Sequence, residues 1–455
     1  MIDPKWAWEP YSPSSEAPWD IRRVGHLYRR AAFGANWAEL REGLSQSPQK
    51  LIDELLAGGS DGPAFPESIK KGNEGELLPA WWLKRILETK NPFREKLTIF
   101  WHNHFATSQA KVRNAGFMIG MIELFHKHAL GNFTDLLQEV SKDPAMLIWL
   151  DAATSKKGIP NENYARELME LFSLGIGHYT EADIREAAKA FTGWEIKGKQ
   201  SHFNKSEHDN SQKTVLGKSG RFQGEDVVKI CLDQPACAEF ICGKLFRFFI
   251  SESLPPTPEL IDPLAQEFRD SGYNFGKLVE RVLRSNIFFS EHAYRARVKS
   301  PVDFAIGIVR GLEGNVSTIA LEQALEGLGQ RLCYPPSVKG WDGGAAWLNG
   351  QTLLFRQNLA LALTSTEDDR FKSRTDPARL AKHYEQTDAD KPVDFFLKLF
   401  LQNDVSVGTR ERLTQYLATA RKQKPPVYWT DDQAADHPVR ALCHLVLTLP
   451  EFQLD

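Results

Sequence analysis

The sequence predicts a mainly α-helical protein, a large globular assembly of many helices with one irregular polar insertion. Apolar residues recur at helical spacing along nearly the whole chain of 455 residues. Hydrophobic residues make up 42% of the chain, and its 12 Trp and 27 Phe can fill a large core. We find no internal repeat and no low-complexity tract, so we expect one interlocked core.

The length alone gives a prior of roughly three domains, but large helical proteins often join such units around a shared core. Residues 1–19 are rich in Pro, Ser and Trp, and we expect an extended segment that drapes over the surface. Residues 20–455 are expected to form a single large helical domain.

In the first half, the spacing of Leu27, Ala31 and Leu40 predicts amphipathic helices within 20–56. Further helices are expected at 77–90, 92–108, 115–130, 133–141 and 161–174. Thr180 and Asp183 have the spacing of a capping box that begins the next helix.

Between residues 195 and 223 the pattern changes to polar residues, Gly and Lys with isolated apolar positions. This pattern predicts an irregular insertion or a small hairpin, placed where it can cover a site.

Helical spacing then returns. The helices expected in the second half are 224–233, 235–251, 257–271, 275–284, 301–312, 319–328, 350–364, 393–402, 409–423 and 437–449. Residues 335–344 are dense in Pro and Gly and predict a shaped loop, and 365–391 is a polar stretch.

Charge and composition exclude several classes of protein. The formal net charge is −3 and the pI is about 6.5, so no overall field favours nucleic acid or an anionic membrane. No stretch reaches the roughly 18 consecutive apolar residues of a membrane span. Asp3, Glu9, Glu16 and Asp20 interrupt any signal-peptide core, so as given the chain is expected to be cytoplasmic.

The cysteines also bear on the compartment. They are odd in number and match no paired zinc pattern: Cys231, Cys237, Cys242, Cys333 and Cys443. We expect free, buried thiols and a reducing environment.

The segment 101–105 contains two histidines in an aromatic setting. On a helix, His104 lies within the arc of Phe100 and Trp101, whereas His102 points away. Two histidines at this spacing cannot bind one metal from a regular helix. His104 is either a core histidine bonded to a backbone carbonyl or carboxylate, or a ligand or acid–base residue.

The segment 161–174 carries a polar arc on one side of its helical wheel. Glu162 and Arg166, at i and i+4, form an ordinary surface pair if the arc is only a solvated face. The functional alternative is that Glu167 and Glu170, at i and i+3, hold a divalent metal with a His from a neighbouring helix. The Glu-x-x-His of di-iron sites is missing.

Two further places are candidates for the mouth of a site. His208 and Asp209 lie in the insertion and bring an imidazole and a carboxylate, although such loop residues are commonly just exposed. Trp341, among glycines of the 335–344 loop, either caps a pocket or plugs the core. Walker, dinucleotide-binding, Gly-x-Ser-x-Gly and His-Glu-x-x-His signatures do not occur.

Several segments together resemble a bacterial family catalogued as domain of unknown function 1800. They are residues 100–105, 161–175, 179–194, 208–209, 335–344 with Trp347 and Asn349, and 445–453. The resemblance runs from about His26 to Gln453 and implies no established catalytic residue. Proteins similar to this one are often exported and encoded beside alkaline-phosphatase-like or sulfatase-like proteins, whereas no export signal is recognised in this chain.

Whether the chain is an enzyme stays open at this point. Our first hypothesis is a metal-dependent hydrolase in which His104 or His102 binds a divalent ion of unknown identity together with Glu167 and Glu170. Glu162 is then the candidate general base, and Arg166 holds an anionic substrate group. His102 is the alternative catalytic imidazole.

The second hypothesis is a noncatalytic helical partner or maturation factor of an alkaline-phosphatase-like or sulfatase-like protein, with the polar arc as its docking face.

Overall fold

The computed structural model describes residues 2–72, 75–365, 368–372, 375–426 and 429–455. Within these ranges it contains 24 α-helices and two small two-stranded sheets. The predicted mainly α-helical fold is therefore confirmed.

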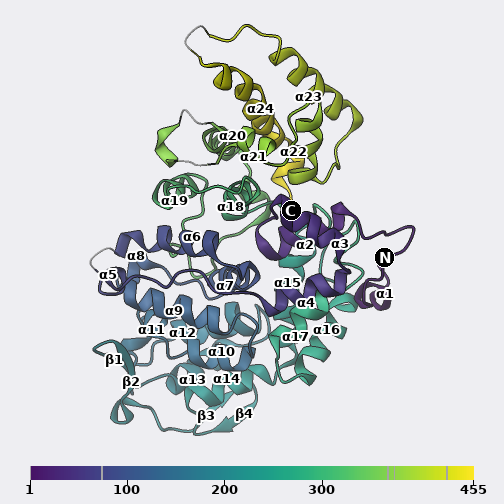
Figure 1. The fold of residues 1–455 in the computed structure, drawn as a ribbon. Coiled ribbons are helices and arrows are strands. Elements are labelled where there is room, and N and C mark those ends of the chain that lie inside the picture. The colour runs from purple at the N-terminus through teal and green to yellow at the C-terminus, as the bar shows by residue number, and fades with distance from the viewer. Residues whose placement is uncertain (1, 73–74, 366–367, 373–374, 427–428) are drawn as a thin grey trace.

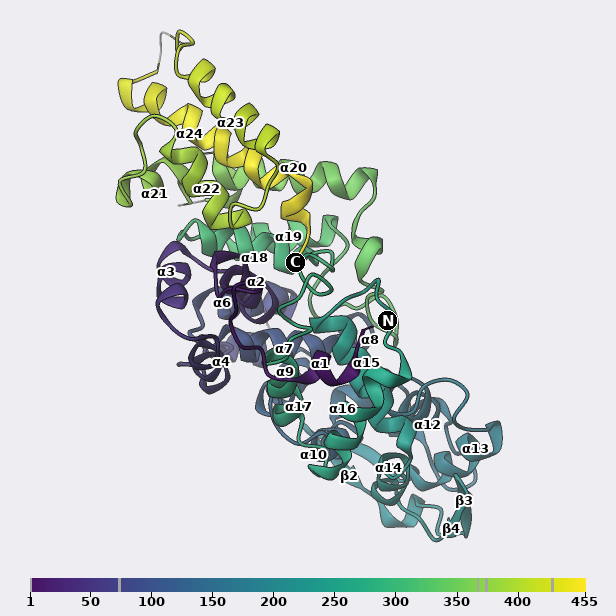
Figure 2. The ribbon, with the colours of Figure 1, turned by 90° about the vertical axis from the view of Figure 1, so that its right-hand side faces the viewer.

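The molecule is elongated, as two perpendicular views agree (Figures 1 and 2). The helices after residue 350 gather at one end, and the four strands lie at the opposite end. The N-terminal helices occupy the middle together with segments from the second half of the chain. One contiguous cluster of buried apolar side chains extends from Ala7 to Phe452.

The first half contains the expected helices, with ends that differ by a few residues, and four short helices that were not expected. They are α1 (Pro4–Trp8), α2 (Ile21–Ala32), α3 (Trp37–Ser45), α4 (Pro48–Ala57), α5 (Glu67–Lys70), α6 (Leu78–Glu88), α7 (Pro92–His104), α8 (Gln109–Val112), α9 (Ala115–Lys127), α10 (Phe133–Val140), α11 (Pro144–Trp149), α12 (Asn163–Glu167) and α13 (Glu181–Ala190). The capping box between Thr180 and Asp183 is present at the start of α13.

The second half is helical too. Its helices are α14 (Gly224–Leu232), α15 (Pro235–Phe249), α16 (Pro258–Asp270), α17 (Phe275–Leu283), α18 (Pro301–Gly311), α19 (Thr318–Gly327), α20 (Gly350–Thr364), α21 (Pro377–His383), α22 (Lys391–Leu401), α23 (Val407–Ala420) and α24 (Asp431–Thr448). The last helix begins six residues earlier than expected because Thr430 and Gln433 form a capping box. In the polar stretch 365–391, residues 366–367 and 373–374 lie outside the described residues.

The insertion forms two antiparallel hairpins. Strand β1 (Trp194–Lys197) pairs with β2 (Gln200–Phe203), and β3 (Lys213–Val215) pairs with β4 (Lys218–Gly220). Strand β3 packs against α13. Of the two alternatives considered for residues 195–223, an irregular insertion or a small hairpin, the structure shows hairpins, and it has two of them.

The first residues differ from the extended segment that was expected. The Asp3 side chain accepts from the main-chain N–H of Lys5, and Pro4 occupies the first turn, so a short helix begins there. Trp8 is buried and donates its indole N–H to the carbonyl of Leu260 at 2.8 Å. The indole anchors this segment in the core.

Segment 161–174 departs from a regular helix. Helix α12 passes directly into a π-helix, Leu168–Ser173, in which the main-chain N–H of Leu174 reaches the carbonyl of Met169 at 2.9 Å. A π-helix widens the turn and changes which carbonyls stay free for other donors.

Two further expectations are tested by the fold. All five cysteines are free and buried, as predicted. Across the described residues, no helix combines the length and the apolar character that crossing a bilayer requires.

Candidate active site

A cavity of about 670 Å³ opens between helices α7 and α15, the π-helix and the 335–344 loop. Its apolar wall includes five aromatic side chains, those of Phe100, Phe240, Phe248, Trp341 and Trp347. Nine charged side chains also face it: Lys96, Glu170, Lys244, Arg247, Glu252, Arg297, Asp303, Lys339 and Asp342. Apolar walls with a few polar groups are typical of ligand sites.

Three of the cations in this cavity are neutralised by neighbouring acids. The Nζ of Lys96 lies 2.5 Å from Asp303 Oδ1. Arg297 pairs with Glu252 at 3.4 Å. Lys339 pairs with Asp342 at 2.7 Å.

The remaining cations are Lys244 and Arg247, one turn apart on α15. Within the part of the chain that the structure describes, neither forms an ion pair with a carboxylate. The remaining acid, Glu170, accepts a hydrogen bond from the hydroxyl of Tyr179 at 2.7 Å. The lining therefore contains five cations and four acids, and this excess of one positive charge favours an anionic ligand.

Lys244 is held by two acceptors from different elements. Its Nζ lies 3.0 Å from His104 Nδ1 and donates to the carbonyl of Leu171 at 3.2 Å. The other ring nitrogen of His104, Nε2, lies 3.1 Å from the carbonyl of Phe172. Because a carbonyl only accepts, Nε2 carries the proton and Nδ1 is left as the acceptor for Lys244.

Both carbonyls come from the π-helix, so this local irregularity positions the pair. Burial, together with the charge of Arg247, lowers the pKa of Lys244 to about 8. Burial and the charge of Lys244 hold the pKa of His104 well below its ordinary value, so the imidazole is neutral.

The 335–344 loop closes the cavity against α7. The main-chain N–H of Trp341 donates to Asn103 Oδ1 at 2.8 Å. Gly340 has a φ of +86°, and a Cβ there would collide with the Asn103 side chain. Trp341 is buried and lines the cavity.

His102 faces away from this cavity, as the helical wheel predicts. It is buried, and its Nε2 accepts from the main-chain N–H of Cys333 at 3.1 Å. Its ring packs edge-on against Trp82 and Trp341. Burial lowers the pKa of His102 to about 3, which is typical of a core imidazole.

The polar arc of 161–174 divides between the surface and the cavity. Arg166 contacts Glu181 through two hydrogen bonds of 2.7 and 2.8 Å and also Glu162 at 3.4 Å. Glu167 is half-buried, and burial together with Glu170 raises its pKa. Of these residues only Glu170 lines the cavity with His104.

His208 and Asp209 do not line this cavity. His208 is buried in the insertion, where its Nδ1 lies 3.0 Å from the carbonyl of Thr192. The Asp209 carboxylate accepts from the main-chain N–H of Ser211 at 2.8 Å. Both residues shape the insertion locally.

The donor set does not favour the expected metal site. No group of three or more His, Cys, Asp and Glu side chains suited to a metal ion occurs among the described residues. Both ring nitrogens of His104 already have partners, so it can bind a metal only after losing one of them.

Comparison with protein families identifies the family of this chain. Residues 26–454 match the protein family of unknown function DUF1800. The chain belongs to the DUF1800 family. No curated protein and no solved structure matches it.

Two lining residues of this DUF1800 member, Lys244 and Arg247, were not expected at a site. Their helix was predicted, but the two cations were not singled out. The signal was available: two cations at i and i+3 stand in an otherwise apolar run with Ile241, Leu245 and Phe246. Placing cations in such a run is costly unless they face a polar or open space.

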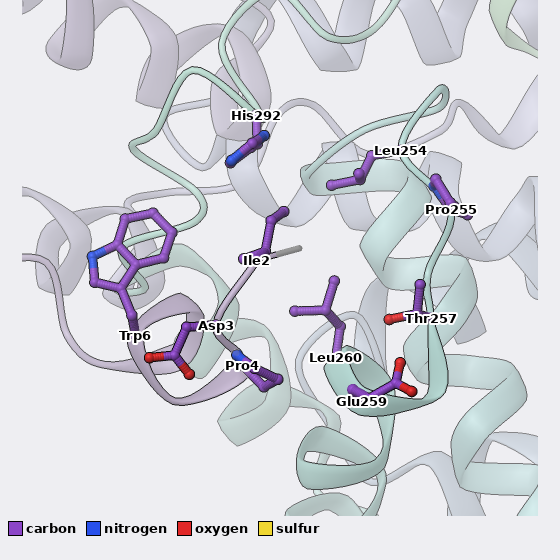
Figure 3. A pocket seen from close by; sticks show the side chains of 10 residues that line it. All are labelled: Ile2, Asp3, Pro4, Trp6, Leu254, Pro255, Thr257, Glu259, Leu260 and His292. Atoms are coloured by element: carbon purple, nitrogen blue, oxygen red, sulfur yellow. The ribbon is translucent and has the colours of Figure 1, made fainter.

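A second cavity, of about 580 Å³, lies between α1 and the segment that leads into α16 (Figure 3). It is mainly apolar, with Trp6 and Leu260 among the side chains that line it. Asp3, at its edge, already caps α1. This cavity lacks a cluster of titratable groups comparable with His104 and Lys244, so the first cavity is the better candidate for chemistry.

Proposed function

We propose that this DUF1800 protein is an enzyme that acts on a small, partly apolar organic anion in the α7–α15 cavity. Lys244 is the acid–base residue, and His104 is the residue that positions it. The observation that carries this proposal is the Lys244 amine in the cavity wall, 3.0 Å from an imidazole nitrogen and without a carboxylate partner among the described residues.

A lysine in this environment has the right properties for proton transfer. With a pKa of about 8, roughly a tenth of the Lys244 side chains are neutral at pH 7. At the ordinary value of 10.5, fewer than about one in a thousand would be neutral. General bases work best when their pKa lies near the working pH.

The charge of the cavity indicates the class of substrate. Lys244 and Arg247 carry the positive charge that the neighbouring acids leave unpaired, so a carboxylate or phosphate group is favoured beside them. The rings of Phe240 and Phe248 offer contact to an apolar body.

The test is chemical modification with trinitrobenzenesulfonate, an aromatic anion that reacts with a lysine only when its amine is neutral. The rate at each lysine is followed by peptide mass spectrometry across a pH series. We expect the Lys244 rate to reach half its maximum near pH 8, well below the value for exposed lysines. Benzoate should slow the reaction at Lys244.

The exchange Arg247→Gln should weaken protection by benzoate, because it removes the cation nearest to Lys244 on α15. Lys277, exposed on α17, is the internal control. If Lys244 reacts with the same pH dependence as Lys277, or if benzoate protects neither, the proposed site is wrong.

A metal-dependent hydrolase is the second candidate. It is favoured by one observation, that His104 and Glu170 line the same cavity. For this function His104 must exchange Lys244 or the Phe172 carbonyl for a metal ion. Stoichiometric metal in purified protein, lost in His104→Ala and Glu170→Ala, would support it.

The noncatalytic partner role is favoured by apolar side chains exposed on α20, namely Leu354 and Leu361. Co-expression with an alkaline-phosphatase-like or sulfatase-like protein tests it. A stable complex that persists in His104→Ala would favour this role over catalysis.

A further inference from the structure

We propose that Lys244 acts as a nucleophile and forms an imine with an aldehyde or ketone that carries a carboxylate or phosphate group. This inference deepens the proposed function, because it rests on the same cavity and names the reacting group of the substrate.

The surroundings of the Lys244 amine leave one side of it open to the cavity. An ammonium has three N–H donors, and two of the positions around Nζ are occupied by His104 Nδ1 and the carbonyl of Leu171. Lys244 lines the cavity, so the third position is the one available to a ligand. When the amine is neutral, its lone pair can point there.

The walls near Nζ favour an uncharged amine. Burial lowers the pKa of Lys244, and this effect outweighs the cation–π contact with Phe240, whose ring centroid lies 4.8 Å from Nζ. Arg247 lies one turn further along α15, and its positive charge opposes a second cation beside it. Lysines that form imines are activated in this way, by apolar surroundings and a neighbouring cation.

The reaction balances without an external oxidant or reductant. The nitrogen lone pair of Lys244 attacks the carbonyl carbon, and the C=O π bond breaks to give a carbinolamine. Both nitrogen protons end on the former carbonyl oxygen, which leaves as water while the C=N bond forms. His104 Nδ1, 3.0 Å from Nζ, accepts a hydrogen bond from the amine and so orients the nitrogen lone pair toward the cavity.

Arg247 favours carbonyl compounds that also carry an anionic group. Residues at i and i+3 on a helix lie on the same face, with Cβ atoms about 5–6 Å apart. A carboxylate or phosphate held by Arg247 therefore places a carbonyl a few bonds away against Lys244. Carbonyl compounds without an anionic group lose this contact.

The experiment uses para-carboxybenzaldehyde with cyanoborohydride, which reduces an imine to a stable secondary amine. The full-length protein is treated at pH 7, and the modified lysines are mapped by peptide mass spectrometry. We expect Lys244 to be modified at least about tenfold faster than Lys277. Benzaldehyde should react more slowly at Lys244, and para-(hydroxymethyl)benzoate should give no adduct.

Variants separate the roles of the two cations. Arg247→Gln should remove the preference for para-carboxybenzaldehyde over benzaldehyde, whereas Lys277→Met should leave modification of Lys244 unchanged. Mapping the adduct in the unaltered protein keeps the test independent of whether Lys244→Met folds.

The outcomes distinguish this inference from the proposed function. If trinitrobenzenesulfonate titrates Lys244 near pH 8 with benzoate protection, but no reduced adduct forms there, imine formation is wrong and the acid–base role stands. If adducts spread evenly over the exposed lysines, imine formation at Lys244 is also excluded. If Lys244 fails both tests, both proposals fall.

Discussion

The main-chain N–H of Trp341 donates to the side-chain oxygen of Asn103 at 2.8 Å, and this bond ties the 335–344 loop to the helix that carries His104. Asn103 lies between the two histidines of segment 101–105, so one turn of α7 supports both the loop and the imidazole beside Lys244. The loop in turn contributes Trp341 to the cavity wall.

Replacement of Asn103 by Ala should loosen this loop. The Trp341 N–H loses its acceptor, which for a partly buried group costs about 1–3 kcal/mol. We expect a lower free energy of unfolding and faster modification of Lys244 by trinitrobenzenesulfonate, because the cavity becomes easier to enter. Asn103→Asp retains an acceptor oxygen and should keep more of both properties. Equal modification rates in all three proteins would contradict this role of Asn103.

The buried pair of Lys96 and Asp303 also lines the cavity. Asp303→Asn leaves the buried ammonium without its counter-charge, and we expect a loss of about 3–5 kcal/mol in the free energy of unfolding. Urea denaturation measures this loss. The double exchange Lys96→Met with Asp303→Asn should recover part of it, since no unpaired charge remains buried. A single exchange that costs less than about 1 kcal/mol would contradict the prediction.

His102 is expected to lower the free energy of unfolding at acid pH. In the folded protein its pKa is about 3, below the ordinary value of 6.5. Between these two pH values His102 therefore binds a proton in the unfolded chain but not in the folded protein. The contribution of His102 is therefore fully present above pH 6.5 and is lost as the pH falls toward 3, by about 1.4 kcal/mol per unit.

Urea denaturation of the protein and of His102→Asn at several pH values between about 7 and 4.5 isolates this contribution. The variant should show a shallower decline, although other buried histidines such as His26 still add to the slope in both proteins. Parallel curves would show that His102 does not titrate on unfolding.

The insertion offers a test of the role first considered for His208. Its imidazole bonds the carbonyl of Thr192 and lies outside the cavity lining. We expect His208→Ala to increase hydrogen exchange in the hairpin β1–β2 and to leave the pH dependence of Lys244 modification unchanged. A shift in that pH dependence would place the insertion at the site after all.

Helical periodicity predicted most of the fold, because the spacing of apolar residues within a single segment shows which face of a helix is buried. The expected helices at 92–108 and 235–251 correspond to α7 and α15. The failures were also local. The start of α1 was hidden by a Pro-rich composition, although Asp3 and Pro4 are ordinary signals for a helix start.

The candidate site was harder to predict because it depends on contacts between distant segments. His104 and Glu170 were singled out and do line one cavity. Lys244 was missed, since nothing near it in the sequence indicates that a histidine 140 positions earlier lies beside it. The departure of 168–173 from regular helical geometry also has no clear signature in the residues themselves.

The π-helix makes residues 168–173 sensitive to the deletion of a residue. The carbonyls of Leu171 and Phe172 hold the lysine and the imidazole because the backbone is wound more loosely there. Removing one residue from 168–173 would restore regular helical geometry and turn both carbonyl oxygens away. The His104 ring could then carry its proton on Nδ1 instead of Nε2. The spacing of one helical turn thus sets the tautomer of a side chain 68 positions upstream.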